Sequence, residues 1–175
     1  MVLNPLRSHC VRHGPQLLRL PLRFTPFAVK KPLLQVLLRW QFQQALEEGE
    51  LDFLEGRWLG IEVSDLELCW SVTLQQGKLQ VAERAEADVW FRGNANDLVL
   101  IAARRQDPDT LFFQRRLLIE GDTELGLEVK NLMDAIDLES MPRPLRIGLM
   151  QLADFIEAGL KKDAISPADR AGVSC

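Results

Sequence analysis

The stretch RRLLIEGDTELGLEVKNLMDAID, residues 115–137, decides the fold expected for this chain of 175 residues. Leu117 and Ile119 share one face of a predicted strand, because side chains alternate with a period of two. Gly121 permits an unusual backbone angle at the corner that follows. Asp122 is a good N-cap for the next helix. The stretch therefore predicts a short strand, a tight turn and a capped helix.

The predicted helix after this turn carries one apolar stripe, with spacings typical of a helix that covers a sheet. Its members are Leu125, Val129, Leu132, Met133 and Ile136. The neighbouring carboxylates Glu120, Asp122 and Glu124 are interpreted as a cap and its solvent-facing flank. From the patterning alone, a packed core and a ligand pocket both remain open.

Strand-like alternation recurs upstream of this unit. Strands are predicted near residues 57–63, 66–74, 79–81 and 87–92, and residues 75–78 form a hairpin turn with its glycine in the left-handed region. Short connections of this kind predict a mostly antiparallel sheet with one buried face.

Helical spacing predicts four more helices. They span about residues 32–48, starting at Pro32, then 94–105, capped by Asn94, then 108–113 and 145–161. We expect an N-terminal arm over residues 1–31, one domain over 32–163 and a disordered tail over 164–175.

The arm is basic and the rest of the chain is acidic. Residues 1–46 hold seven Lys and Arg and no Asp or Glu, although the whole chain has a net charge of −4. This asymmetry predicts contact with an anionic membrane or with partner proteins, and docking of the arm on its own acidic domain is the alternative. The contact residues expected are Arg12, Arg19, Arg23, Phe24, Phe27, Lys30 and Lys31.

The sequence argues against several function classes. The two histidines, His9 and His13, lie beside Cys10 but have no third metal ligand, so no metal site is predicted. No histidine falls inside the domain to serve a nucleophile, and no glycine loop matches a phosphate-binding motif. The acidic domain disfavours nucleic acid. Three scattered cysteines fit a reducing cytosol.

Two dibasic pairs, residues 104–105 and 115–116, have two interpretations that remain open. They are either a clamp for a phosphate or lipid headgroup, or a solvated face.

The segments ADVWF (87–91) and LIEGD (118–122), each followed by a helix, resemble the sterol carrier protein type 2 family. Arg116 stands where that family's motif has lysine. The resemblance implies an α+β fold, with a five-stranded, mainly antiparallel sheet covered by helices on one side and enclosing an apolar tunnel. It makes a lipid pocket the leading interpretation.

A closer resemblance covers nearly the whole chain. The segments LPLRFTPFA (20–28), LDFLEGRWL (51–59) and IAARRQDPDTLFFQRR (101–116) are similar to bacterial accessory factors of ubiquinone biosynthesis. This implies a non-catalytic, cytoplasmic or peripheral inner-membrane protein without a cofactor. It would bind prenylated quinone precursors beside UbiU and UbiV in oxygen-independent synthesis. A protein scaffold, a general phospholipid or fatty-acid carrier and a hydrolase or transferase are the alternatives.

The lipid-contacting residues are predicted from their apolar positions on the matching helices and strands. They are Leu98, Ile101, Leu111, Phe112, Phe113, Leu117, Ile119, Leu125, Val129, Leu132, Met133, Ile136, Leu145, Leu149, Leu152, Phe155 and Ile156.

Overall fold

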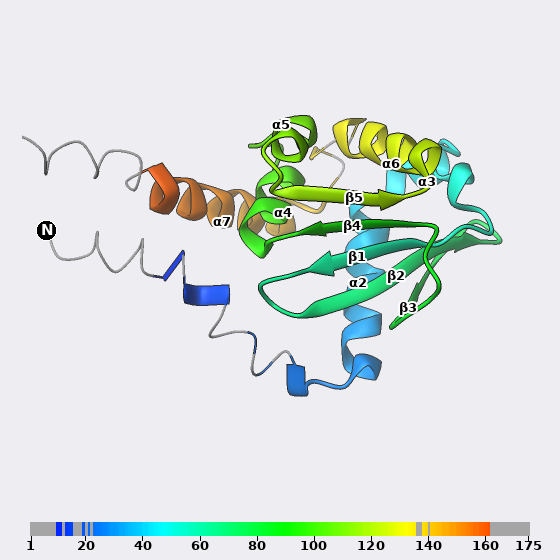
Figure 1. Ribbon diagram of the computed structural model, residues 1–175, viewed down its shortest axis with the longest axis horizontal. Helices are drawn as coiled ribbons and strands as arrows, with labels where there is room; N and C mark the ends of the chain where they lie inside the picture. The colour runs from blue at the N-terminus through cyan, green and yellow to red at the C-terminus, as the bar shows by residue number, and fades with distance from the viewer. Residues whose placement is uncertain are drawn as a thin grey trace, which may run out of the picture.

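The computed structural model describes residues 10–11, 13–15, 19, 21, 23–135, 138–139 and 141–161. Its centre is one sheet, with strands β1 (Leu59–Val63), β2 (Leu68–Gln75), β3 (Lys78–Ala82), β4 (Val89–Gly93) and β5 (Leu117–Gly121) (Figure 1). The strand order is β3-β2-β1-β4-β5. The predicted tail and residue Ile136 lie outside the described residues.

The sheet is mixed, with one parallel pair. β1 runs parallel to β4, while the pairs β1–β2, β2–β3 and β4–β5 are antiparallel. The predicted α+β class and the mainly antiparallel sheet are therefore confirmed. The predicted hairpin is also present, since Gln76 and Gly77 both have positive φ, at 51° and 69°. Of the predicted strands, the one from residue 66 begins later, at Leu68, after a turn.

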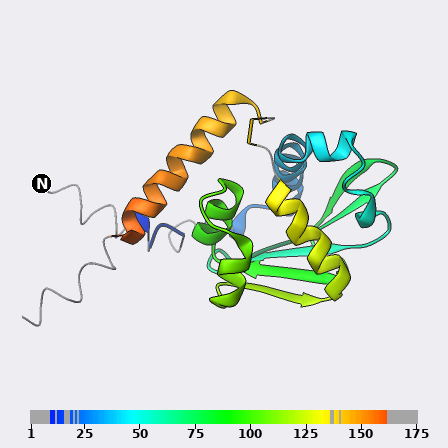
Figure 2. The same ribbon diagram turned by 90° about the horizontal axis from the view of Figure 1, so that it is seen from above.

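The helices are α2 (Phe27–Gln41), α3 (Gln43–Glu47), α4 (Ala95–Ala102), α5 (Pro108–Phe113), α6 (Thr123–Ala135) and α7 (Arg143–Lys161), with a 3-10 turn, η1, at Asp52–Leu54. Figure 2 shows α2, α3 and α6 on the same side of the strands. The main core lies between the sheet and the helices α3 to α6, and α2 contributes no buried residue to it. It combines apolar side chains from the sheet with side chains from α4, α5 and α6.

The opposite face of the sheet carries a charged network around Arg92. Arg92 pairs with Glu62, at 3.1 Å between Nε and Oε2, and with Glu120 on the neighbouring strand. Its guanidinium also lies 5.6 Å from the ring centroid of Trp90. That ring packs on Gly60, where a Cβ atom would lie 2.4 Å from it. On this face, the side chains of three neighbouring strands are thus tied together around Arg92.

The turn between β5 and α6 matches the sequence prediction closely. Gly121 has a φ of 121°, which only glycine adopts readily. Asp122 caps the helix, because its Oδ1 accepts a hydrogen bond of 2.9 Å from the backbone N–H of Leu125. The backbone N–H of Asp122 itself donates to the carbonyl of Asp88, at 2.8 Å. The turn therefore ties α6 to the start of β4.

The predicted start of the first helix, at Pro32, is wrong. α2 begins at Phe27, after Pro26, and Pro32 lies inside it. A proline within a helix removes one hydrogen bond. Because no residue of α2 is buried, the carbonyl of Ala28 that loses its partner faces a surface where water can replace it. The predicted helix is also divided at Phe42, which separates α2 from α3.

The predicted capping of α4 by the side chain of Asn94 is also wrong. Asn94 occupies the N-cap position with extended backbone angles, but its side chain makes no capping hydrogen bond. Instead, Oδ1 of Asp65 accepts a hydrogen bond of 2.8 Å from the backbone N–H of Ala95. A carboxylate from the β1–β2 turn thus satisfies the first turn of α4.

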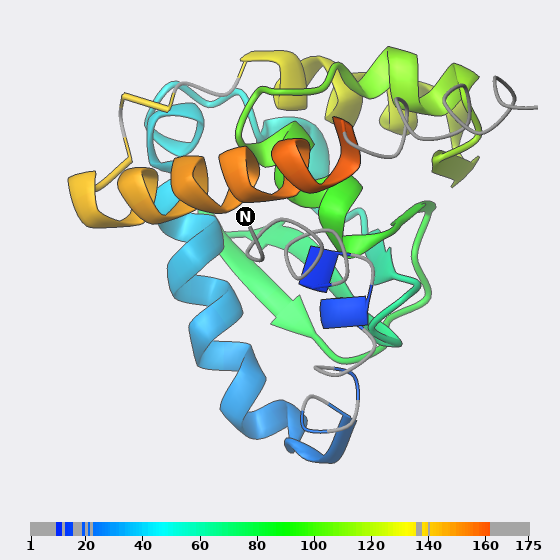
Figure 3. The same cartoon turned by 90° about the vertical axis from the view of Figure 1, so that its left-hand side faces the viewer.

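The last helix, α7, packs on α4 and forms a second, smaller core. Its buried residues Ala153 and Ile156 lie against Leu100 of α4 and against Ala103, the C-cap of that helix. Figure 3 shows α7 beside α4. One residue near the N-terminus, Val11, is also buried in this second core, with 3% of its surface exposed.

Candidate functional site

The predicted lipid-contacting residues separate into three groups. The first group lies in or against the main core and consists of Ile101, Leu111, Leu117, Leu125, Val129, Leu132, Leu98, Ile119 and Met133. The second lies in the smaller core and consists of Leu149 and Ile156. Phe112, Phe113, Leu152 and Phe155 are exposed, Leu145 is half-buried and Ile136 is outside the described residues.

The first group is assembled by the β5–α6 unit. Leu117, Leu125 and Leu111 have no exposed surface. The helix lies close to the sheet because Gly126 has no side chain: a Cβ atom there would come within 3.0 Å of Cγ2 of Ile119. The predicted stripe on α6 therefore contacts the sheet directly. The predicted contact of these side chains with a lipid stays a prediction.

One surface hollow lies between α4, α5 and α6, and we call it the arginine hollow. It has a volume of about 330 Å³. Its lining residues are Ile101, Arg104, Arg105, Gln106, Asp107, Pro108, Met133 and Asp134. Its floor is apolar, because Ile101 belongs to the main core and Met133 packs against that core. Ile101 and Met133, which were predicted to contact lipid, thus line the same hollow as the dibasic pair Arg104 and Arg105.

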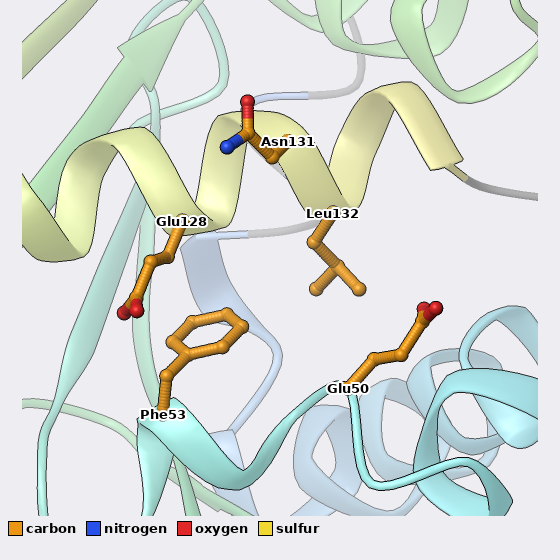
Figure 4. A pocket seen from close by; sticks show the side chains of 5 residues that line it. All are labelled: Glu50, Phe53, Glu128, Asn131 and Leu132. Atoms are coloured by element: carbon orange, nitrogen blue, oxygen red, sulfur yellow. The ribbon is translucent and has the colours of Figure 1, made fainter.

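A second hollow, the acidic hollow, lies on the other side of α6. It has a volume of about 260 Å³ and is lined by Glu50, Phe53, Glu128, Asn131 and Leu132. In Figure 4, Glu128 and Leu132 point from α6 toward Phe53 and Glu50, whereas Asn131 points away. Its floor also reaches the main core, through Leu132 and Phe53. Among the residues that the structure describes, no cation lines this hollow.

Ion pairs hold the helices around the arginine hollow. Nζ of Lys130 on α6 donates to both carboxylate oxygens of Asp109 on α5, at 2.9 and 3.0 Å. This hydrogen bond raises the pKa of the Lys130 ammonium. A guanidinium N–H of Arg105 donates to Asp154 of α7 at 2.6 Å. The hollow is therefore bordered by contacts that join α5 to α6 and the α4–α5 loop to α7.

The start of α5 is ordered by its own cap. The Asp107 carboxylate accepts hydrogen bonds from the backbone N–H and the hydroxyl of Thr110, at 2.8 and 2.9 Å. The backbone hydrogen bond, followed by the hydroxyl, lowers the pKa of the Asp107 carboxyl. This cap fixes the loop that presents Arg104 and Arg105 beside α6.

The second dibasic pair has a structural contact. The guanidinium of Arg116 pairs with Asp97, whose side chain is only 4% exposed. The first turn of α4 thus holds a buried carboxylate that is neutralised by the residue just before β5. Among the described residues, no three or more His, Cys, Asp or Glu side chains lie together where they could hold a metal ion.

The described part of the arm contacts the domain through Val11 and through two arginines. The carbonyl of Val11 accepts a hydrogen bond of 2.9 Å from the side-chain amide of Asn96. Arg19 and Arg23 both pair with Glu67 in the β1–β2 turn. These contacts fit the alternative in which the arm docks on its own domain.

The other arm residues predicted to touch a membrane or partner differ in exposure. Phe24 is 79% exposed, and Lys31 also faces solvent. Phe27 and Lys30 are half-buried, and Arg12 lies outside the described residues. In the described part of the chain, no helix is long and apolar enough to cross a bilayer.

Sequence reasoning missed much of the polar lining of both hollows. Gln106, Asp134, Glu50 and Glu128 come from separate elements and form no recognisable motif. Only Arg104 and Arg105 carried a signal, as an adjacent basic pair. Their neighbours become visible only when α4, α5 and α6 are packed together.

Known proteins are similar to this chain in sequence and in fold. The model of the SCP-2 sterol transfer family matches residues 36–134. The ubiquinone biosynthesis accessory factor UbiT of Escherichia coli K12 is 58% identical over 174 residues, which cover 99% of this chain and 100% of that protein. The proteins of the same name from strains O6:H1 and O157:H7 match equally well.

A solved structure named UbiJ-SCP2 ubiquinone synthesis protein has a similar fold. It aligns with a TM-score of 0.52 and 19% identity, covering 62% of this chain and 97% of that one. At this identity the likeness concerns the fold alone.

Proposed function

The chain belongs to the SCP-2 sterol transfer family and to the family of UbiT, and on that premise we propose that it is a non-catalytic accessory factor of ubiquinone biosynthesis. In this proposal it binds the isoprenoid tail of ubiquinone precursors among its apolar helices. The observation that carries the accessory role is the 58% identity to UbiT over essentially the full length of both chains.

Lipid binding is supported by where the predicted residues lie. Leu125, Val129 and Leu132 turn one face of α6 toward the sheet, and both hollows beside α6 have floors that belong to this core. Burying the apolar surface of a prenyl chain contributes about 25 cal/mol per Å², reduced by the cost of ordering the chain. A tail that enters beneath α6 must displace side chains that now contact one another.

The non-catalytic role is supported by the structural contacts that the charged groups near this core make. Asp122 caps α6, Asp97 neutralises Arg116, and Asp109 holds Lys130. Each of these carboxylates has a structural partner. We therefore assign the protein a role in holding and presenting a substrate for other proteins.

The pathway and the partners follow from the resemblance to UbiT. We infer that the protein acts in oxygen-independent synthesis beside UbiU and UbiV and works in the cytoplasm, with peripheral contact at the inner membrane. Exposed Phe24 and Lys31 support such contact. Because Arg19 and Arg23 pair with Glu67, membrane contact by these arginines would first require those pairs to open.

A complementation experiment tests the accessory role. The chain is expressed in an E. coli strain that lacks its own UbiT, and ubiquinone and its prenylated precursors are quantified in cells grown with and without oxygen. We expect restored ubiquinone without oxygen, and expression of UbiT itself is the positive control. Failure of an abundant, folded protein to restore ubiquinone would contradict the proposal. Rescue confined to aerobic growth would contradict the oxygen-independent role.

A further inference from the structure

The two hollows beside α6 share a floor but differ in charge. Both reach the main core, one through Met133 and the other through Leu132, which are adjacent on α6. The arginine hollow is lined by two arginines and two aspartates, whereas the described lining of the acidic hollow has two glutamates and no cation. A ligand with one polar end and one apolar end would therefore distinguish between them.

The polar lining of the arginine hollow suits a neutral group that carries oxygen atoms. Arg104, Arg105 and Gln106 supply N–H donors, and Asp107 and Asp134 supply acceptors. The formal charges of this lining cancel. A phosphate would be attracted by the arginines but repelled by the two carboxylates nearby. Hydroxyl, methoxy or carbonyl oxygens on a ring can accept from these donors, and a ring hydroxyl can also donate to a carboxylate.

The volume of the hollow also limits what it can hold. About 330 Å³ is near the lower end of the range for small-molecule pockets, so it accommodates a substituted ring but not a long prenyl chain as well. A chain attached to that ring would have to leave through the apolar floor formed by Ile101 and Met133. That direction leads into the core beneath α6.

From these observations we propose that the arginine hollow binds the oxygenated aromatic ring of the ligand, while the tail passes beneath α6. This inference rests on the proposed lipid-binding function and adds a subsite for the head group. Asp134 accepts a hydrogen bond from the ring, and the α4–α5 loop donates to its oxygens. The ion pair between Lys130 and Asp109 joins α6 to α5 beside the hollow. When the tail enters, this pair must either stay intact or open.

Binding of two probes to the full chain tests the subsite. One probe is a ubiquinol with a short prenyl chain, and the other is the prenyl alcohol of the same chain length, which lacks the ring. Affinities are measured by equilibrium dialysis under reducing conditions. The variants are Asp134→Ala, at the arginine hollow, and Glu128→Ala, a matched carboxylate on α6 that lines the acidic hollow.

We expect wild type to bind the ring probe more tightly than the alcohol. Loss of one hydrogen bond in Asp134→Ala should weaken ring binding about fivefold to tenfold and leave alcohol binding unchanged. Glu128→Ala should behave like wild type. Circular dichroism and urea midpoints check that both variants are folded.

The other outcomes separate the two proposals. Equal binding of both probes by wild type, an unchanged ring affinity in Asp134→Ala, or an equal loss in Glu128→Ala would overturn the ring subsite and leave lipid binding standing. If wild type binds neither probe, both the subsite and the lipid-binding function are overturned.

Discussion

Replacing Gly121 by alanine should destabilise the fold more than a simple loss of glycine flexibility would. The backbone φ of Gly121 is 121°, a value that residues other than glycine rarely adopt. An added Cβ would also lie 2.2 Å from the carbonyl oxygen of Asp88 and 2.9 Å from Cα of Val89. Both are backbone atoms of the β4 region, so no side-chain rotation can relieve the contact.

The magnitude has two parts. Forcing a non-glycine residue into this backbone region costs about 1–3 kcal/mol. Overpacking against atoms that cannot move aside adds about 1–3 kcal/mol. We expect the free energy of unfolding to fall by about 3–4 kcal/mol, a large share of the usual 5–15 kcal/mol.

Gly77→Ala is the matched control. Gly77 also has a positive φ, of 69°, but no heavy atom lies within 4 Å of an added Cβ. The free energy of unfolding of Gly77→Ala should therefore fall only by the cost of the backbone conformation, about 1–2 kcal/mol. Urea unfolding followed by circular dichroism gives both values. Equal losses in the two variants would refute the close approach of Gly121 to Asp88, and with it the described anchoring of α6.

Three further predictions concern the caps and the arm. Asp122→Ala should lower the free energy of unfolding by about 1 kcal/mol, measured by urea denaturation, because the first turn of α6 loses its side-chain cap. Hydrogen bonds from Thr110 lower the pKa of the Asp107 carboxyl. Its stabilising effect is therefore present above the unfolded-state pKa and is lost as the pH falls through the lowered, folded-state pKa. Urea midpoints at a series of acidic pH values should fall less steeply in Asp107→Asn, and an identical fall would disprove this. Reversing the charge of Lys30 and Lys31 to Glu should weaken sedimentation with anionic liposomes at least tenfold at low salt and have no effect with neutral liposomes. An unchanged affinity would exclude membrane contact through these lysines.

Local patterns predicted the parts of the fold that depend on neighbours in sequence. The alternation of Leu117 and Ile119, the glycine corner and the Asp122 cap all lie within a few residues of one another. Their physical causes, side-chain period and backbone sterics, act over that range. The turn at Gly77 was predictable for the same reason.

Features that depend on distant residues could not be predicted. Asp65 replaces Asn94 as the cap of α4 because the β1–β2 turn folds back onto that helix, which no local pattern indicates. Pro26 starts α2 ahead of Pro32 because a surface helix tolerates an internal proline. Periodicity predicted that Met133 would face the core, but not that it would meet Arg104 at one hollow.

The most direct test of the central claim is the identity of lipids that accompany the protein. The full chain is expressed in cells that make ubiquinone, purified without detergent, and examined by native mass spectrometry and by organic extraction. The account predicts a species heavier by one prenylated ubiquinone precursor, in near-stoichiometric amount. Recovery of phospholipid or fatty acid in its place would identify a general carrier. A lipid-free protein that also fails to take up added precursor would contradict the account.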